Sequence, residues 1–375
     1  MKSGKSITTA QIDDSSLYPC YGGNGIRGRT KNKTHSGDYA LIGRQGALCG
    51  NVFGVSGDFY ASEHAVVVTP SDEIEIKWLT FVLKKMGLNQ YSESSAQPGL
   101  SVSKILKLEV KLPPTKAEQE AIAEVLLDAD AWIESLEKLI AKKRNLKQAA
   151  MQQLLTGQTR LPGFEGKWVE RRLGDLGELI KGTGVSRNEA NSGDIPCVRY
   201  GELYTFHAEI IRSFNSCISQ DIAKNALRLK AGDILFAGSG ETKEEIGKCA
   251  AYCDNMEAYA GGDIVVLRQE KNGPKFLGYI LNSDAVVEQK SSYGQGDAVV
   301  HISAKSLAKV QVSLPAESEQ TAIAKVLADM DTEIEALEGK LEKARRIKEG
   351  MMAELLTGKT RLVEPKAVPF RYPDV

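Results

Sequence analysis

Apolar side chains recur at alternating steps of four and three along two stretches of the chain. In the second stretch nine of ten stepped positions are apolar: Ile323, Leu327, Met330, Ile334, Leu337, Leu341, Ala344, Lys348, Met351 and Leu355. This spacing is typical of the a and d positions of a coiled coil, so it predicts a long helix with one seam. The first stretch places Ile122, Leu126, Ala129, Ile133, Leu136, Ile140 and Leu154 on an equivalent stripe. Lys143 and Lys147 lie on that stripe too, so we expect looser packing there.

The two stretches are copies of one sequence. Residues 114–161 and 315–362 align without a gap at an offset of 201 and are identical at 25 of 48 positions. Each copy has proline near its start and Thr-Gly at its end, which are ordinary helix start and stop signals. We expect two helices of roughly 40 residues, each about 60 Å long. A dimerisation zipper is one interpretation, but two seams in one chain favour an intramolecular, antiparallel pair with a globular body at each end.

The segments outside the helices read as short β segments punctuated by glycine. The pattern predicts strands at 40–42, 65–68, 234–236, 263–267 and 310–314, helices at 76–86 and 275–282, and long polar loops at 22–35 and 291–297. The expected fold class is α+β: two globular bodies separated by two long helices that form an intramolecular antiparallel coiled coil. The expected boundaries are 1–112 and 161–313 for the bodies, 113–160 and 314–358 for the helical spacers, and 359–375 for a tail.

Charge gives no global case for a polyanionic partner, because the net charge is −1. A local case exists in the first fifty residues, where seven basic side chains face three acidic ones. Residues 167–314 hold 18 basic and 19 acidic side chains, so the second body would bind nucleic acid through a few placed residues.

Cysteine usage and hydropathy indicate a cytoplasmic protein. The six cysteines show no paired framework, and the start of the chain lacks the apolar core of a secretory signal. No apolar run approaches the length of a membrane span. The four histidines are scattered and Cys249 and Cys253 have no second pair at zinc-site spacing, so we expect no metal.

Several short motifs are similar to those of enzymes. Phe236-Ala237-Gly238-Ser239-Gly240 matches in letters the glycine-rich loop of S-adenosylmethionine-dependent methyltransferases, but the chain lacks their Asn/Asp-Pro-Pro-aromatic tetrapeptide. It also lacks a phosphate-binding P-loop and a Gly-x-Ser-x-Gly elbow. A carboxylate cluster of Glu241 with Glu244 or Glu245 is more simply a solvated loop. The sequence therefore predicts a chain that is not itself an enzyme and binds no cofactor.

The order of motifs resembles the specificity subunit of type I restriction-modification systems. The resemblance covers nearly the whole chain and rests on the Leu-Leu-Thr-Gly helix ends, on Glu118-Gln119 and Glu319-Gln320, and on three further segments: Tyr21-Gly22-Gly23-Asn24-Gly25-Ile26-Arg27-Gly28, Leu41-Ile42-Gly43-Arg44-Gln45-Gly46 and Gly232-Asp233-Ile234-Leu235. It implies two target-recognition domains that each read half of a split sequence in double-stranded DNA, and spacers that set the gap. It further implies methyltransferase (modification) subunits, which hold the S-adenosylmethionine, and a translocating endonuclease (restriction) subunit as partners.

Side-chain chemistry suggests which residues contact DNA. Arginine and glutamine can make bidentate contacts to base edges, so Arg27, Arg44 and Gln45 are candidate base readers. Lys5, Arg29, Lys31 and Lys33 are candidates for phosphate contacts. Further candidates are Asn24 in the first body and, in the second, Lys181, Arg187, Arg199, Tyr200, Lys243 and Gln295.

One departure from the resembled family concerns the first body. The second body opens with Trp168-Val169-Glu170-Arg171-Arg172-Leu173-Gly174-Asp175-Leu176, whereas the first begins almost directly at Gly4, and residues 363–375 supply no second copy. Two other functions stay open at this point: a self-contained methyltransferase that uses residues 236–240, and a coiled-coil scaffold without a role on DNA.

Overall fold

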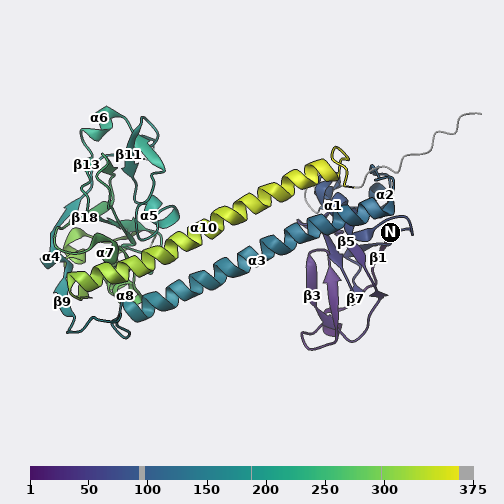
Figure 1. Ribbon diagram of the computed structural model, residues 1–375, viewed down its shortest axis with the longest axis horizontal. Coiled ribbons are helices and arrows are strands. Elements are labelled where there is room, and N and C mark those ends of the chain that lie inside the picture. Colours follow the sequence, from purple (N-terminus) through teal and green to yellow (C-terminus); the bar gives the residue numbers. More distant parts are fainter. Residues whose placement is uncertain (93–97, 187, 297, 363–375) are drawn as a thin grey trace, which may run out of the picture. The chain divides into compact units, whose positions relative to one another are not determined.

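The computed structural model describes residues 1–92, 98–186, 188–296 and 298–362. The chain divides into two compact units: unit 1 is Met1–Lys138 with Glu338–Val375, and unit 2 is Leu139–Leu337. Each unit holds one mixed body of strands and short helices (Figure 1). Each also holds one part of both long helices.

Unit 1 is built on two four-stranded sheets. The first has the order β1 (Lys2–Ser3), β8 (Ala65–Val68), β5 (Tyr39–Gly43) and β6 (Val52–Val55), with neighbours antiparallel. α1 (Ile76–Lys85) packs on it and completes a core that includes Ile42, Val66 and Leu83. The second sheet has the order β3 (Gly25–Thr30), β2 (Tyr18–Gly22), β7 (Asp58–Ala61) and β4 (His35–Ser36). The short helices are η1 (Thr9–Gln11), η2 (Leu88–Tyr91) and α2 (Val102–Ile105).

Unit 2 repeats this arrangement. Its first sheet has the order β10 (Glu178–Lys181), β18 (Ile264–Arg268), β14 (Ile234–Ala237) and β16 (Cys249–Ala251). Its second has the order β12 (Ser216–Ile218), β11 (Ile195–Val198), β17 (Tyr259–Ala260) and β13 (Leu227–Arg228). Two-stranded pairs join β15 (Ser239–Gly240) to β19 (Val300–His301) and β9 (Val169–Arg172) to β20 (Gln311–Leu314). The short helices are α4 (Leu173–Leu176), α5 (Glu202–Thr205), α6 (Gln220–Ala223), α7 (Pro274–Ile280), α8 (Asp284–Tyr293) and α9 (Ala304–Leu307).

The pairing directions match between the units. β2 lies parallel to β7 as β11 lies parallel to β17, and β1 pairs with β8 as β10 pairs with β18. A counterpart of the β9–β20 pair is not found among the described residues of unit 1. Pro113 aligns with the buried Leu314 of β20 at the offset of 201, and the preceding Leu112 is 52% exposed.

Two predicted loops were wrong in part. The segment 22–35 contains strand β3, and the segment 291–297, of which residue 297 lies outside the described residues, begins inside α8. Both elements bury little apolar surface: β3 reads Gly-Ile-Arg-Gly-Arg-Thr, and only Val286 and Lys290 are buried in α8. Hydrophobic periodicity cannot reveal elements whose apolar side chains are so few.

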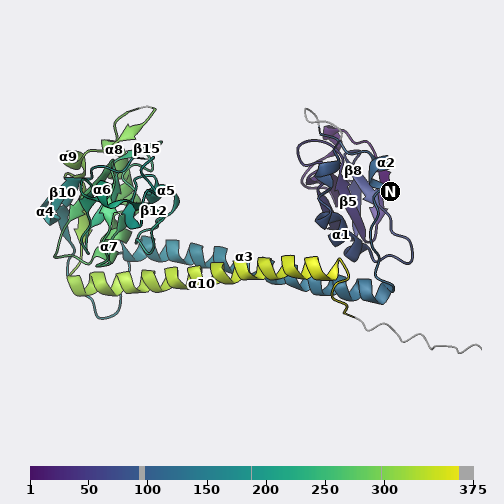
Figure 2. The same cartoon turned by 90° about the horizontal axis from the view of Figure 1, so that it is seen from above.

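The long helices are α3 (Lys116–Leu154) and α10 (Glu317–Leu355), 39 residues each (Figure 2). In unit 1 the first part of α3 packs against the last part of α10, where Ile122 and Leu126 share a core with Leu355. In unit 2 Leu154 shares a core with Ile323 and Leu327. The helices are therefore antiparallel within each unit, and the expected fold class is confirmed.

Each lysine on the seam is paired with a carboxylate of the other helix. Lys147 lies 2.6 Å from Asp331, and Lys348 pairs with Asp130 in the same way 201 positions along. Lys143 lies 2.6 Å from Glu333. A seam position that carries lysine is thus satisfied by an acidic partner rather than left unpaired.

The Glu-Gln pair at the start of each long helix joins that helix to its surroundings. Gln119 accepts a hydrogen bond from the backbone N–H of Glu75, which caps α1, at 2.8 Å. Gln320 accepts one from the N–H of Gly273, which caps α7, at 3.0 Å. The two copies therefore make the same contact to the equivalent helix of their own body.

Candidate nucleic-acid interface

Strand direction brings several candidate residues of unit 1 to one sheet edge. β1 and β5 are both antiparallel to β8, so they end at the same edge. Lys5 follows β1, and Arg44 with Gln45 follows β5. The Arg44 N–H donates to the His64 carbonyl at 2.9 Å, and the Gln45 side-chain oxygen lies 2.9 Å from Nδ1 of His64.

The hairpin between β2 and β3 packs on this edge and adds Asn24 to it. A Cβ at Gly23 would lie 3.2 Å from the His64 carbonyl, and a Cβ at Gly43 would lie 2.1 Å from the carbonyl of Gly23. Gly23 and Gly43, which belong to the segments that resemble the specificity subunits, therefore allow two backbones to approach closely. Asn24 in the turn is exposed.

Arg44 is held while much of its hydrogen-bonding capacity stays available. Its Nη1 donates to the Ser3 hydroxyl at 3.2 Å. A guanidinium has five N–H donors, so one contact of this kind orients the side chain and leaves donors for a base edge.

Glu63 and His64 were not predicted from the sequence. Glu63 accepts a hydrogen bond from the Ile7 N–H at 3.2 Å, and its other oxygen lies 3.3 Å from Nε2 of His64. Both residues support the edge that carries Gln45. No spacing in the sequence signals this, because only the β5–β8 register brings positions 44 and 64 together.

The four basic residues of 27–33 differ in their surroundings. Arg29 donates to the carbonyls of Ser16 and Leu17. Lys33 lies 2.9 Å from Asp58, whose carboxylate raises the pKa of Lys33 above its ordinary value. Arg27 and Lys31 are exposed. The phosphate role predicted for Arg29 and Lys33 would have to compete with these internal partners.

Unit 2 presents an equivalent edge. β10 and β14 are both antiparallel to β18, so Lys181 and the Ser239 turn lie at the same end of the sheet. The Ser239 hydroxyl lies 2.8 Å from Nδ1 of His301. Gln295 and His301 exchange two backbone hydrogen bonds of 3.0 and 2.8 Å. Ser239 and His301 are a second pair of residues at this edge that was not predicted from the sequence.

Arg199 and Tyr200 reach the same edge from the end of β11. The buried carboxylate of Glu202 accepts from the Arg199 N–H at 3.1 Å and fixes this turn. Tyr204, on the following helix, donates its hydroxyl to the Ser239 carbonyl at 3.1 Å, and burial raises its pKa to about 12. Lys243 is exposed on the loop after β15, and Arg187 lies outside the described residues.

The glycine-rich segment 236–240 has a packing explanation. A Cβ at Gly238 would lie 2.9 Å from the Asp263 carbonyl, and a Cβ at Gly240 would lie 2.7 Å from the Tyr204 hydroxyl. Both glycines thus admit protein atoms at close range. Close packing therefore explains the two glycines of this segment.

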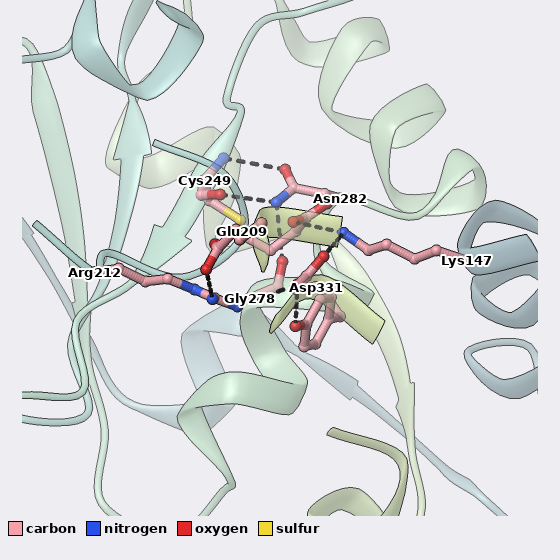
Figure 3. A network of polar contacts seen from close by, with 9 residues as sticks. Lys147, Glu209, Arg212, Cys249, Gly278, Asn282 and Asp331 are labelled. Carbon is pink, nitrogen blue, oxygen red and sulfur yellow. Dashed lines mark hydrogen bonds and ion pairs between the residues drawn. The ribbon is translucent and has the colours of Figure 1, made fainter. Parts of the chain in front are cut away.

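A polar network ties the second body to the long helices (Figure 3). Lys147 of α3 lies between Glu209, at 3.1 Å, and Asp331 of α10, at 2.6 Å. Asp331 also accepts the Tyr279 hydroxyl at 2.5 Å, and Arg212 approaches it at 3.6 Å. Burial alone lowers the pKa of Lys147, but the two carboxylates more than offset this and raise it.

In the described part of the chain, the His, Cys, Asp and Glu residues form no group of three or more that could hold a metal ion. All six cysteines are unpaired. Among the helices described, none is long and apolar enough to cross a membrane.

The two bodies have equivalent topology, and each has candidate base-reading residues at one sheet edge. Each body is also fixed to antiparallel helix segments. The chain is therefore a duplicated protein with two similar modules. The family model of the type I restriction modification DNA specificity domain matches residues 1–143 and 165–346. The chain therefore belongs to the type I restriction-modification DNA specificity family.

Individual relatives agree with this assignment. The type I restriction enzyme EcoprrI specificity subunit of Escherichia coli is 47% identical over 140 residues, a match that spans 36% of this chain and 35% of that relative. The type I restriction enzyme MjaVIII specificity subunit of Methanocaldococcus jannaschii is 24% identical over 294 residues, 75% of this chain and 68% of that protein.

Solved structures show the same fold. A type I restriction-modification S subunit from M. genitalium gives a TM-score of 0.65 at 17% identity and covers 94% of this chain and 92% of that one. A chain from work on complex assembly and conformational transition of the type I R-M system gives 0.52 at 15% identity, with 96% of both chains covered.

Proposed function

We propose that this chain is the non-catalytic, sequence-reading subunit of a type I restriction-modification complex. Each body contacts one half of a split target in double-stranded DNA. Methyltransferase subunits, which carry the S-adenosylmethionine, and an endonuclease subunit assemble on the paired helices in the cytoplasm.

The observation that carries this proposal is the equivalence of the two edges. In unit 1, Lys5, Arg44 and Gln45 lie beside one end of the first sheet. In unit 2, Lys181, Arg199 and Gln295 lie beside the equivalent end of its own first sheet. The backbone frame is shared, but the side chains on it differ. One frame with two sets of donors and acceptors is what reading two different half-sites requires.

The helix pair supports a scaffolding role. Both helix starts are fixed to their bodies by glutamine and both seams are closed by lysine–carboxylate pairs. Within each unit these contacts limit how the body can move on its own helix segments, which lowers the entropic cost of binding DNA there.

The test is to purify the chain with its methyltransferase partner, treat unmethylated genomic DNA and map the modified adenines. The expected result is one motif with two specified halves separated by a fixed unspecified gap. A continuous motif, or modification without a motif, would contradict the proposal. A self-contained methyltransferase would instead bind labelled S-adenosylmethionine as the isolated chain, and a plain scaffold would give equal gel shifts on all duplexes.

A further inference from the structure

Leu48 is a large apolar side chain held in solvent beside the candidate base readers of unit 1. It is 52% exposed, whereas the next residue, Cys49, is 1% exposed. The loop that carries it runs directly on from Arg44 and Gln45. An exposed leucine alone is unremarkable, so its backbone setting decides what it can do.

The loop is closed at its base by backbone hydrogen bonds. The Gly43 N–H donates to the Asn51 carbonyl at 2.8 Å, and the Gly50 N–H donates to the Gly43 carbonyl at 2.7 Å. Within the loop, the Cys49 N–H donates to the carbonyl of Gly46 at 2.9 Å. These bonds fix residues 43–51 as one turn.

A neighbouring helical segment fixes the same loop from outside. The Asn89 side-chain amide donates to the carbonyls of Ala47 and Cys49 at 3.4 and 2.9 Å. Gly50 has a φ of +85°, and a Cβ there would lie 2.4 Å from the Asn89 N–H nitrogen. The backbone on both sides of Leu48 is therefore positioned before any ligand arrives, and little entropy is lost when Leu48 makes a contact.

Unit 2 closes its equivalent loop in the same way but presents different chemistry. The Gly247 N–H donates to the Ala237 carbonyl at 3.1 Å, and the Ala237 N–H donates to the Lys248 carbonyl at 2.9 Å. This loop is longer, and its exposed side chains from 241 to 245 are Glu, Thr, Lys, Glu and Glu. An apolar reader at this position thus belongs to unit 1 alone.

We infer that Leu48 contacts the C5 methyl group of a thymine in the half-site read by unit 1, and so determines specificity at that base pair. The thymine methyl is the apolar group that the major groove offers beside the donors and acceptors read by arginine and glutamine. This inference rests on the proposed function, because it assumes that the edge with Arg44 faces DNA. Burying one methyl group against leucine is worth a several-fold change in affinity.

The experiment uses the complex with its methyltransferase and duplexes of the mapped target in which single thymines are replaced by deoxyuridine, which lacks only the methyl group. The wild-type complex should lose about fourfold in affinity at one thymine of the half-site. Leu48→Ala should bind the thymine duplex about fourfold more weakly and show no further loss with deoxyuridine. Leu17→Ala is the control. Leu17 is exposed and directly precedes the first residue of β2, at the end of that strand away from Asn24, so this variant should behave as wild type.

Three results would overturn the inference. The first is an equal response of wild type and Leu48→Ala to deoxyuridine at every position, and the second is a half-site without thymine. The third is weaker assembly of Leu48→Ala with the methyltransferase in the absence of DNA, which would place Leu48 against the partner. In all three cases sequence-specific binding by the wild-type complex would leave the proposed function standing, whereas its absence would remove the proposed function itself.

Discussion

Arg160 donates two hydrogen bonds, of 2.5 and 2.6 Å, to the carboxylate of Glu319, which is 1% exposed near the start of α10. The same contact joins Arg361 to Glu118 at the start of α3. The arginine that ends each repeat therefore fixes the glutamate that begins the other. This explains why both repeats carry Glu-Gln at one end and Thr-Arg-Leu at the other.

Glu319→Gln should lower the Tm of the protein. The neutral amide cannot accept two charge-assisted hydrogen bonds from Arg160, and the buried site offers it no water as a substitute. Glu317→Gln, an exposed change two residues earlier, is the matched control and should leave the Tm unchanged. Thermal unfolding followed by circular dichroism measures both, and equal melting of the two variants would contradict a stabilising clamp.

Lys147→Met should destabilise the protein by about 3 kcal/mol, because it leaves the carboxylates of Glu209 and Asp331 facing each other without their shared cation. Lys142→Met, an exposed change on the same helix, is the control. Chemical denaturation at neutral pH compares the two variants.

The same lysine predicts an alkaline loss of stability. Because folding raises the pKa of Lys147, its contribution is fully present below its unfolded pKa and is lost as pH rises through the higher folded value. Wild-type stability should therefore fall above about pH 10.5 by more than that of Lys147→Met. Parallel curves for the two proteins in that range would show that Lys147 does not report on the network.

Arg44→Ala should relax recognition in one half of the target only. A bidentate arginine–guanine contact is worth about 1–3 kcal/mol, so discrimination at one base pair should fall by roughly 5- to 150-fold. Mapping of modified adenines with the variant complex measures this directly. Weakening that is uniform over all sequences would count against a base contact by Arg44.

Lys31→Ala and Lys33→Ala should weaken binding to every duplex alike. Each lost phosphate contact should reduce the slope of log K against log salt by about 0.9. Lys31 is exposed, whereas Lys33 is paired with Asp58, so we expect the larger change from Lys31. Gel shifts across a salt series give both slopes, and a change of sequence preference would contradict phosphate contacts.

The long helices could be predicted from the sequence because their signal is local. Apolar residues every three or four positions indicate a helix from the sequence of that stretch alone, and the pattern occurs in both copies of the repeat. The partners of Lys143 and Lys147 were not predicted, because Glu333 and Asp331 lie on the other helix. Periodicity within one helix contains no information on a partner some 200 positions away.

The candidate reading edges could be predicted only in part. Arg44 and Gln45 were predicted as candidates from their residue types beside glycine, but their neighbour His64 depends on the register of β5 and β8. β8 reads Ala-Val-Val-Val and is buried at all four positions, so no alternation of its side chains specifies that register. The same holds for His301 beside Ser239, which the β15–β19 pair brings together.

Gly240→Ala tests whether the glycine-rich turn serves packing. The new methyl group would lie 2.7 Å from the Tyr204 hydroxyl and 3.3 Å from its ring carbon, so the ring must move and the hydrogen bond to the Ser239 carbonyl is strained. We expect the variant to lose about 1–3 kcal/mol of stability.

The double variant Gly240→Ala with Tyr204→Phe tests whether Gly240 is present because of the Tyr204 hydroxyl. Removing the hydroxyl removes the closest clash, so the double variant should be more stable than the sum of the two single effects allows. Gly339→Ala, at a helical position with no atom within 4 Å of the new Cβ, is the control and should stabilise the protein by about 0.5–1 kcal/mol. Strict additivity of the two substitutions would show that Tyr204 does not require a glycine at position 240, and the packing explanation of Gly240 would fail with it.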